Sequence, residues 1–120
     1  RGASAAVLVD RDPVAIAACR ANAQELGEAA RVRIVRADAF AFLGGAGRGL
    51  EADVVLLDPP YAFDGWETLL ERLRICQAVR AGAMVVIERA ARRDPVTAPG
   101  YRALRSARYC ATALAVLVRE

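Results

Sequence analysis

Short apolar runs alternate with helix-forming segments along the chain, and this alternation limits the folds that the sequence can adopt. Strand-like runs occupy 5–9, 31–36, 53–57 and 83–88, helical patterns occupy 13–26, 39–43 and 64–78, and two final strand-like segments occupy 101–108 and 111–119. Strand–helix–strand alternation predicts an α/β fold with a mostly parallel sheet, helices on both faces and an antiparallel pair at the end. The apolar strand at 53–57 is expected at the buried centre of that sheet.

An aspartate closes or follows three of these strands: Asp10, Asp38 and Asp58. Because the C-terminal ends of parallel strands meet at one edge, where ligands of such sheets bind, we expect the three carboxylates to share a rim. Asp10 is placed to bind the ribose hydroxyls of an adenosine cofactor, and Asp38 to accept from an adenine amino group. Both also have a simpler interpretation, since aspartate is common in turns and as the N-cap of a helix.

The most informative motif is Asp58-Pro59-Pro60-Tyr61, directly after the apolar strand at 53–57. Two prolines end the strand and stiffen the turn, and since proline has no N–H the backbone there offers only carbonyl oxygens. The Asp58 carboxylate and the Pro59 carbonyl then form adjacent acceptors beside the Tyr61 ring. A planar base with an exocyclic NH2 group fits this set, provided that the base is flipped or unpaired.

The composition excludes several classes of protein. The 120 residues are 56% hydrophobic and 26% charged, which indicates one globular domain. No apolar run is long enough to cross a bilayer and no signal-peptide pattern is present, so we expect a cytoplasmic protein without a membrane partner. Three well-separated cysteines and the lack of histidine argue against a metal site, disulfides and histidine-dependent hydrolases, and favour reduced cysteines in the core. The net charge of +3 is compatible with a nucleic-acid partner.

These motifs resemble those of class I S-adenosylmethionine-dependent methyltransferases. The segments that match the second, third and fourth motifs of that class are Val9-Asp10, Asp38-Ala39 and Asp58-Pro59-Pro60-Tyr61. The opening Arg1-Gly2-Ala3, the segment Asp10-Arg11-Asp12 and the final strand pair look like the RsmD-like enzymes, which make N2-methylguanine in small-subunit ribosomal RNA.

The resemblance implies a Rossmann-like sheet, S-adenosyl-L-methionine as cofactor, ribosomal RNA or the small ribosomal subunit as partner, and a monomer. It also implies roles for individual residues. The cofactor-binding residues would be Asp10, Arg11, Asp38, Ala39 and Asp58, and the catalytic residues would be Asp58, Pro59, Pro60 and Tyr61. No metal is expected.

The sequence departs from this family in two places. No glycine-rich loop matches the one that follows the first strand of such enzymes, since Gly44-Gly45-Ala46-Gly47 comes only after Asp38. We therefore expect 1–120 to be the C-terminal part of one class I methyltransferase domain, without the first strand, the cofactor loop or an N-terminal RNA-binding extension, and inactive alone. Cys110-Ala111 replaces a glycine-containing turn, which leaves the last hairpin open.

Two other functions remain open from the sequence. A DNA adenine-N6 methyltransferase uses the same Asp-Pro-Pro-Tyr chemistry, although it normally needs an additional target-recognition segment. A catalytically silent methyltransferase-like module would bind RNA or a protein instead. The missing cofactor loop favours this module, and the intact tetrapeptide argues against it.

Overall fold

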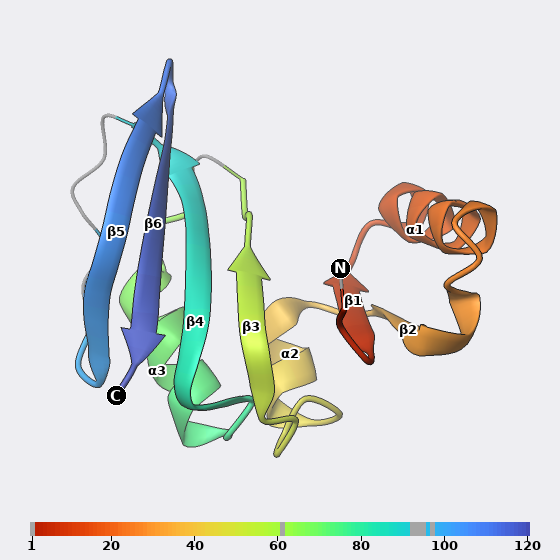
Figure 1. Ribbon diagram of the computed structural model, residues 1–120, viewed down its shortest axis with the longest axis horizontal. Coiled ribbons are helices and arrows are strands. Elements are labelled where there is room, and N and C mark those ends of the chain that lie inside the picture. Colours follow the sequence, from red (N-terminus) through yellow and green to blue (C-terminus); the bar gives the residue numbers. More distant parts are fainter. Residues whose placement is uncertain (1, 61, 92–95, 97) are drawn as a thin grey trace. The chain divides into compact units, whose positions relative to one another are not determined.

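The chain folds into two compact units, Arg1–Ala46 and Gly47–Glu120. The computed structural model describes residues 2–60, 62–91, 96 and 98–120 (Figure 1). No helix in these described stretches is long and apolar enough to span a membrane.

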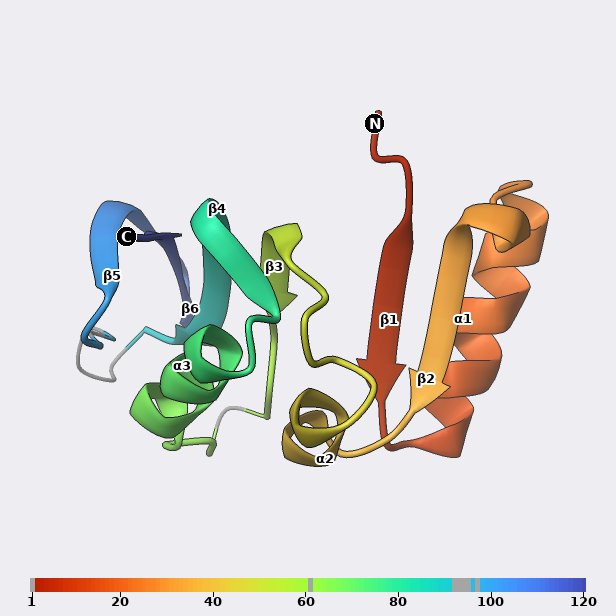
Figure 2. The same ribbon diagram turned by 90° about the horizontal axis from the view of Figure 1, so that it is seen from below.

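The first unit pairs two parallel strands and packs a helix against them (Figure 2). Its elements are β1 (Ala6–Asp10), α1 (Pro13–Glu25), a short 3-10 helix (Ala29–Arg31), β2 (Val32–Arg36) and α2 (Ala39–Gly44). The register runs from Ala6 opposite Val32 to Asp10 opposite Arg36. The C-terminal ends of both strands therefore lie at the same edge.

Local sequence signals set the limits of α1. The carboxylate of Asp12 accepts from the Val14 N–H at 2.9 Å, and Pro13 occupies the first helical position, where no N–H is needed. The helix ends before Gly27, whose φ of +70° is a left-handed conformation that glycine adopts readily. The predicted helix at 13–26 is confirmed within one residue.

The second unit is a four-stranded sheet with one helix on it. Its elements are β3 (Ala52–Leu57), α3 (Trp66–Ile75), β4 (Val79–Ala90), β5 (Tyr101–Tyr109) and β6 (Thr112–Arg119). The strand order is β3-β4-β6-β5, with β3 and β4 parallel and β6 antiparallel to both of its neighbours. The predicted parallel arrangement with an antiparallel final pair is confirmed. The two sheets share no strand pairing among the described residues.

The core of the second unit lies between α3 and one face of the sheet (Figure 2). Its largest fully buried side chains are Leu70, Val79, Val85 and Ile87. The Tyr101 hydroxyl donates to the Leu70 carbonyl oxygen at 2.7 Å, which ties the start of β5 to α3. Apolar burial of this kind is the main force that holds a helix on a sheet.

The predicted central position of the strand at 53–57 is wrong for the described part of the chain. β3 is an edge strand there, with β4 as its one neighbour, and the side chains of Val54 and Leu56 are 51% and 75% exposed. An apolar run shows that a strand can be buried on both faces, but it does not show which neighbours cover it.

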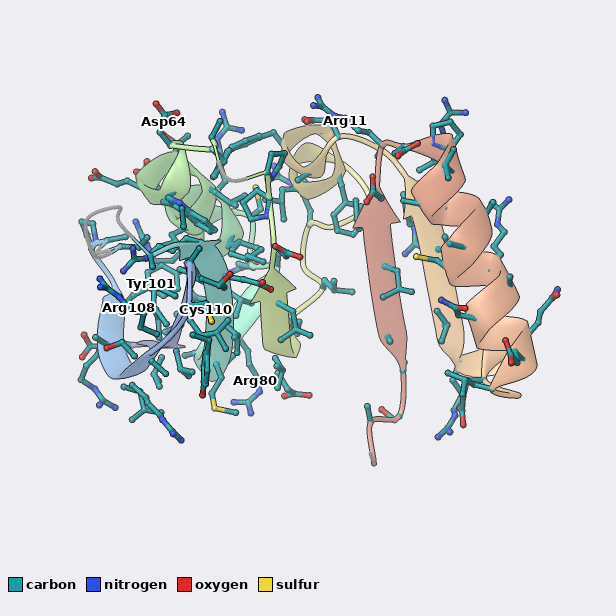
Figure 3. All side chains as sticks on the ribbon, turned by 90° about the horizontal axis from the view of Figure 1, so that it is seen from above. Arg11, Asp64, Arg80, Tyr101, Arg108 and Cys110 are labelled. Atoms are coloured by element: carbon teal, nitrogen blue, oxygen red, sulfur yellow. The ribbon has the colours of Figure 1, made fainter. Side chains whose placement is uncertain are left out.

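Two further elements differ from the sequence prediction. α3 spans Trp66–Ile75 rather than 64–78, with Gly65 as N-cap, and Asp64 points away from the helix (Figure 3). β4 extends on both sides of the predicted 83–88 and includes Gly82 at a φ of +82°.

The cysteines are all free, but they do not all lie in the core. Cys76 is buried, Cys19 is half-buried and Cys110 is exposed, which corrects the prediction of three core thiols. Cys110 has a φ of +53° and occupies the turn between β5 and β6 together with Ala111. The predicted hairpin therefore forms without a glycine in its turn.

Candidate functional site

Asp10 is the last residue of β1, and its side chain is exposed. One carboxylate oxygen, Oδ1, accepts from the Asp12 N–H at 2.8 Å. The other oxygen has no hydrogen bond to any described residue. Asp10 therefore shapes the turn into α1 and keeps one oxygen for a ligand.

Asp38 follows β2 and is the N-cap of α2. Its Oδ2 accepts from the N–H groups of Phe40 and Ala41, at 3.1 and 3.2 Å. The helix-capping interpretation is thus correct, while Oδ1 stays free of intramolecular partners in the described chain. The Ala37 N–H donates to the Asp10 carbonyl at 3.0 Å, so the first unit brings Asp10 and Asp38 to one edge.

Two neighbours of these acids were also predicted to contact the cofactor. Arg11 follows β1 and is exposed. Ala39 is exposed and is the first residue of α2. Because it stands in the first turn, its N–H has no acceptor within the helix. Both lie on the same edge of the β1–β2 pair as the two acids.

Asp58 follows β3, at the end of the strand whose Leu57 lies opposite Ile87 of β4. Its side chain is exposed, and its carboxylate accepts no hydrogen bond from the described residues. Pro59 is half-buried and Pro60 is exposed. The Phe63 N–H donates to the Pro60 carbonyl at 2.9 Å, whereas no described group donates to the Pro59 carbonyl.

Among the described residues, this corner leaves one carboxylate and one backbone carbonyl without a donor. That they bind a substrate amine together stays a prediction. Tyr61 lies outside the described residues, so its stacking role stays a prediction. The shared rim of Asp10, Asp38 and Asp58 also stays a prediction, because it involves both units.

An aromatic pair close to the Asp58–Pro59 corner in the sequence, Phe63 and Trp66, was not predicted. The rings of Phe63 and Trp66 meet edge to face, with their centroids 5.2 Å apart and an interplanar angle of 84°. The signal was visible as two aromatic residues flanking Gly65, three positions apart, directly after the diproline.

β5 runs in the same direction as β3. Tyr101 is the first residue of β5, whereas Asp58 follows the last residue of β3, so the two residues lie at opposite ends of the sheet. Burial raises the pKa of Tyr101 above its ordinary value, and the nearby charges of Arg119 and Arg74 oppose that rise. This tyrosine is a structural link to α3 rather than part of the candidate site. No group of histidine, cysteine or acidic residues within the described stretches could hold a metal ion.

Residues 1–118 match the protein family described as conserved hypothetical protein 95. The chain belongs to this family. It is an RsmD-like methyltransferase family, so the resemblance inferred from the motifs is confirmed. A comparison with curated proteins gives no match to the chain.

Solved structures of similar proteins confirm the Rossmann-like methyltransferase fold. A conserved hypothetical protein of Streptococcus pyogenes is 26% identical with a TM-score of 0.90, covering 100% of this chain and 74% of its own. The Escherichia coli protein yhhF, named as a candidate methyltransferase, is 24% identical with a TM-score of 0.85, covering 98% of this chain and 64% of its own. An RNA methyltransferase of Salinibacter ruber, in complex with S-adenosyl-L-homocysteine, is 23% identical with a TM-score of 0.63, covering 95% of this chain and 65% of its own.

Proposed function

We propose that this member of the conserved hypothetical protein 95 family supplies the catalytic region of an S-adenosyl-L-methionine-dependent RNA methyltransferase. Its substrate would be the exocyclic N2 amine of a guanine in small-subunit ribosomal RNA. The full-length enzyme would act on ribosomal RNA or the small ribosomal subunit, as a monomer in the cytoplasm. The RNA methyltransferase of Salinibacter ruber supports both the cofactor and the class of substrate.

The observation that carries the proposal is the acceptor pair at the diproline corner. No described residue donates to the Asp58 carboxylate or to the Pro59 carbonyl, while the neighbouring Pro60 carbonyl accepts from the Phe63 N–H. An exocyclic NH2 group has two N–H donors, so it fits two adjacent acceptors. Tyr61 would stack on the base, as the motif predicts.

The first unit fits the adenosine part of the cofactor. Asp10 and Asp38 each keep one carboxylate oxygen without a partner among the described residues, at one edge of the β1–β2 pair. Asp10 would accept from the ribose hydroxyls and Asp38 from the adenine amine, with Arg11 and Ala39 beside them. When bound, S-adenosylmethionine supplies an electrophilic methyl group.

The work left to the chain is positioning and electrostatics. The nitrogen lone pair of an aryl amine is delocalised into the ring, so the amine is a poor nucleophile. When its two N–H groups donate to the Asp58 carboxylate and the Pro59 carbonyl, a more tetrahedral nitrogen is favoured and the lone pair is directed to one side. Fixed acceptors of this kind can lower a reaction barrier by about 3–4 kcal/mol.

The test is Asp58→Ala in the full-length protein, assayed with S-[methyl-³H]adenosylmethionine on small ribosomal subunits, free ribosomal RNA and duplex DNA. We expect methyl transfer to RNA to fall by at least about 10²–10³-fold. Cofactor affinity, measured by calorimetry, should stay within about twofold, because Asp58 acts mainly on the amine.

Three results would contradict parts of the proposal. Turnover that survives in Asp58→Ala removes the catalytic assignment. Methylation of duplex DNA in place of RNA replaces the substrate class. A wild-type protein that binds RNA but neither binds the cofactor nor transfers a methyl group would indicate a silent module.

A further inference from the structure

We propose that Phe63 is a positioning residue for the Asp58–Pro59 corner, held in place by Gly65 and Trp66. This inference rests on the proposed function, because it concerns how the acceptor pair is kept in place. Phe63 does not need to touch the base or the cofactor for this role.

The first link is a backbone hydrogen bond. The Phe63 N–H donates to the Pro60 carbonyl at 2.9 Å and so ties Phe63 to the second proline of the corner. This bond decides which proline carbonyl is left for a substrate. It satisfies Pro60 and leaves Pro59, the carbonyl adjacent to the Asp58 side chain.

The second link is the packing of the Phe63 ring. Its edge-to-face partner, Trp66, is the first residue of α3 and is only 9% exposed, so the ring rests on an anchored neighbour. Edge-to-face contact at a centroid distance of 5.2 Å is a favourable aromatic geometry. The turn is therefore tied to the buried face of α3.

The third link is Gly65, which leaves room for the ring. A Cβ atom at Gly65 would lie 3.0 Å from Cζ and 3.1 Å from Cε1 of Phe63. The φ of Gly65 is −83°, which other residues adopt freely, so the backbone does not require glycine there. A side chain at this position would instead press on the aromatic ring, which would have to move by a few tenths of an ångström. The Gly65 carbonyl also accepts from the Leu69 N–H at 2.9 Å, which makes this glycine part of the first turn of α3.

Together these contacts connect a rigid helix to the acceptor pair through one side chain. Removal of the ring should let the turn and the Pro59 carbonyl shift, without changing any group that contacts a ligand. Small displacements of reacting groups reduce rates strongly, by about 100-fold for about 1 Å. The loss should therefore appear in kcat rather than in cofactor affinity.

The experiment is a double-mutant cycle in the full-length protein, assayed on small ribosomal subunits with tritiated S-adenosylmethionine. Phe63→Ala and Gly65→Ala should each lower kcat by about 10- to 100-fold, with the dissociation constant for the cofactor within about twofold. The double variant should be no slower than Phe63→Ala, because the added methyl group has no ring to displace. Phe63→Leu, which restores bulk, should recover part of the rate.

Leu73→Ala is the matched control. Leu73 is buried on the same helix and has no described contact with the Phe63 ring, so this change should lower Tm while leaving kcat unchanged below the melting transition. If Phe63→Ala fails to fold, Gly65→Ala and Phe63→Leu still measure the coupling.

The inference is overturned if Phe63→Ala keeps kcat within twofold of wild type. It is equally overturned if Gly65→Ala slows the Phe63→Ala background further, or if Leu73→Ala loses as much activity. An inactive Asp58→Ala beside a fully active Phe63→Ala rejects the positioning role alone. An active Asp58→Ala rejects the proposed function itself.

Discussion

The two units use their aspartates differently. In the first unit, the carboxylates of Asp10, Asp12 and Asp38 each accept an N–H from a residue two or three positions further along. In the second unit, the Asp58 carboxylate accepts nothing from the described residues. Local hydrogen bonds are sufficient to explain an acid after a strand. Asp53 of the second unit accepts from the Arg80 guanidinium instead, so the lack of a described partner at Asp58 is compatible with the proposed contact to a substrate amine.

The two units also differ in how they are held together. The second unit contains several side chains with no exposed surface, among them Leu70 and Ile87, whereas the most buried side chains of the first unit, Ile16 and Leu43, remain 4% exposed. The first unit also has N-cap hydrogen bonds from the carboxylates of Asp12 and Asp38. In the proposed function its acids would serve both folding and cofactor binding, whereas Asp58 would serve catalysis.

The largest expected effect comes from Asp58→Asn, which tests whether Asp58, unlike the acids of the first unit, has no part in stabilising the fold. The amide keeps one acceptor oxygen but adds an NH2 donor that repels the substrate amine, so kcat should fall by about 100-fold or more. The free energy of unfolding should change by less than about 0.5 kcal/mol, because no intramolecular bond is lost. Parallel kinetics and urea unfolding measure both, and a clear loss of stability would mean that Asp58 has a structural partner after all.

The next largest effect tests the core of the second unit. Leu70→Ala should lower the free energy of unfolding by about 2–5 kcal/mol, because it empties a fully buried site under α3. Leu56→Ala is the control on the same sheet, and with a side chain that is 75% exposed it should cost less than about 1 kcal/mol. Equal losses in urea unfolding would show that the exposed face of β3 is covered in solution.

A smaller effect separates capping from binding in the first unit. Asp12→Ala and Asp38→Ala should each cost about 1 kcal/mol in unfolding experiments, because each removes an N-cap. Only Asp38→Ala should also weaken S-adenosylmethionine binding, and Asp38→Ser should restore the cap without the carboxylate. Calorimetry that finds the same affinity in Asp12→Ala and Asp38→Ala would remove Asp38 from the cofactor site.

The smallest effect concerns Tyr101. Since burial raises the pKa of its phenol above the ordinary value of 10.0, the protonated form is favoured in the folded state. Its contribution to stability should be complete below pH 10 and decline as the pH rises through the folded-state pKa. Tyr101→Phe should cost about 0.5–1 kcal/mol at pH 8 and flatten the decline that sets in above pH 10. Thermal unfolding at several pH values measures this, and an unchanged slope would argue against the Leu70 hydrogen bond.

Features with a local cause could be predicted from the sequence. The limits of α1 follow from the local preferences of Asp12, Pro13 and Gly27. The diproline after β3 likewise predicts a stiff corner from its own two residues. Features that depend on contacts could not. The helix was expected from 64 on its apolar pattern, but it begins at Trp66, after Gly65, whose neighbour in space is the Phe63 ring.

The candidate site shows the same division. Acids at the strand ends were recognisable, and so was the Pro59 carbonyl as an acceptor. The hydrogen bond from Phe63 to the Pro60 carbonyl was not, because a turn geometry is needed to see which carbonyl it occupies. Likewise, the sequence does not show that only one oxygen of each carboxylate, at Asp10 and Asp38, accepts from a backbone N–H.

The exposed outer side of β3 has a practical consequence for handling this chain. Among the described residues β3 is an edge strand. Beyond the irregular register between Ala52 and Val54 it presents unpaired backbone groups beside the exposed side chains of Val54 and Leu56, with no lysine or proline at these two positions. Such edges recruit extended segments from other molecules. Samples of residues 1–120 alone should therefore aggregate as concentration rises, and a charged residue in place of Leu56 should keep them dispersed.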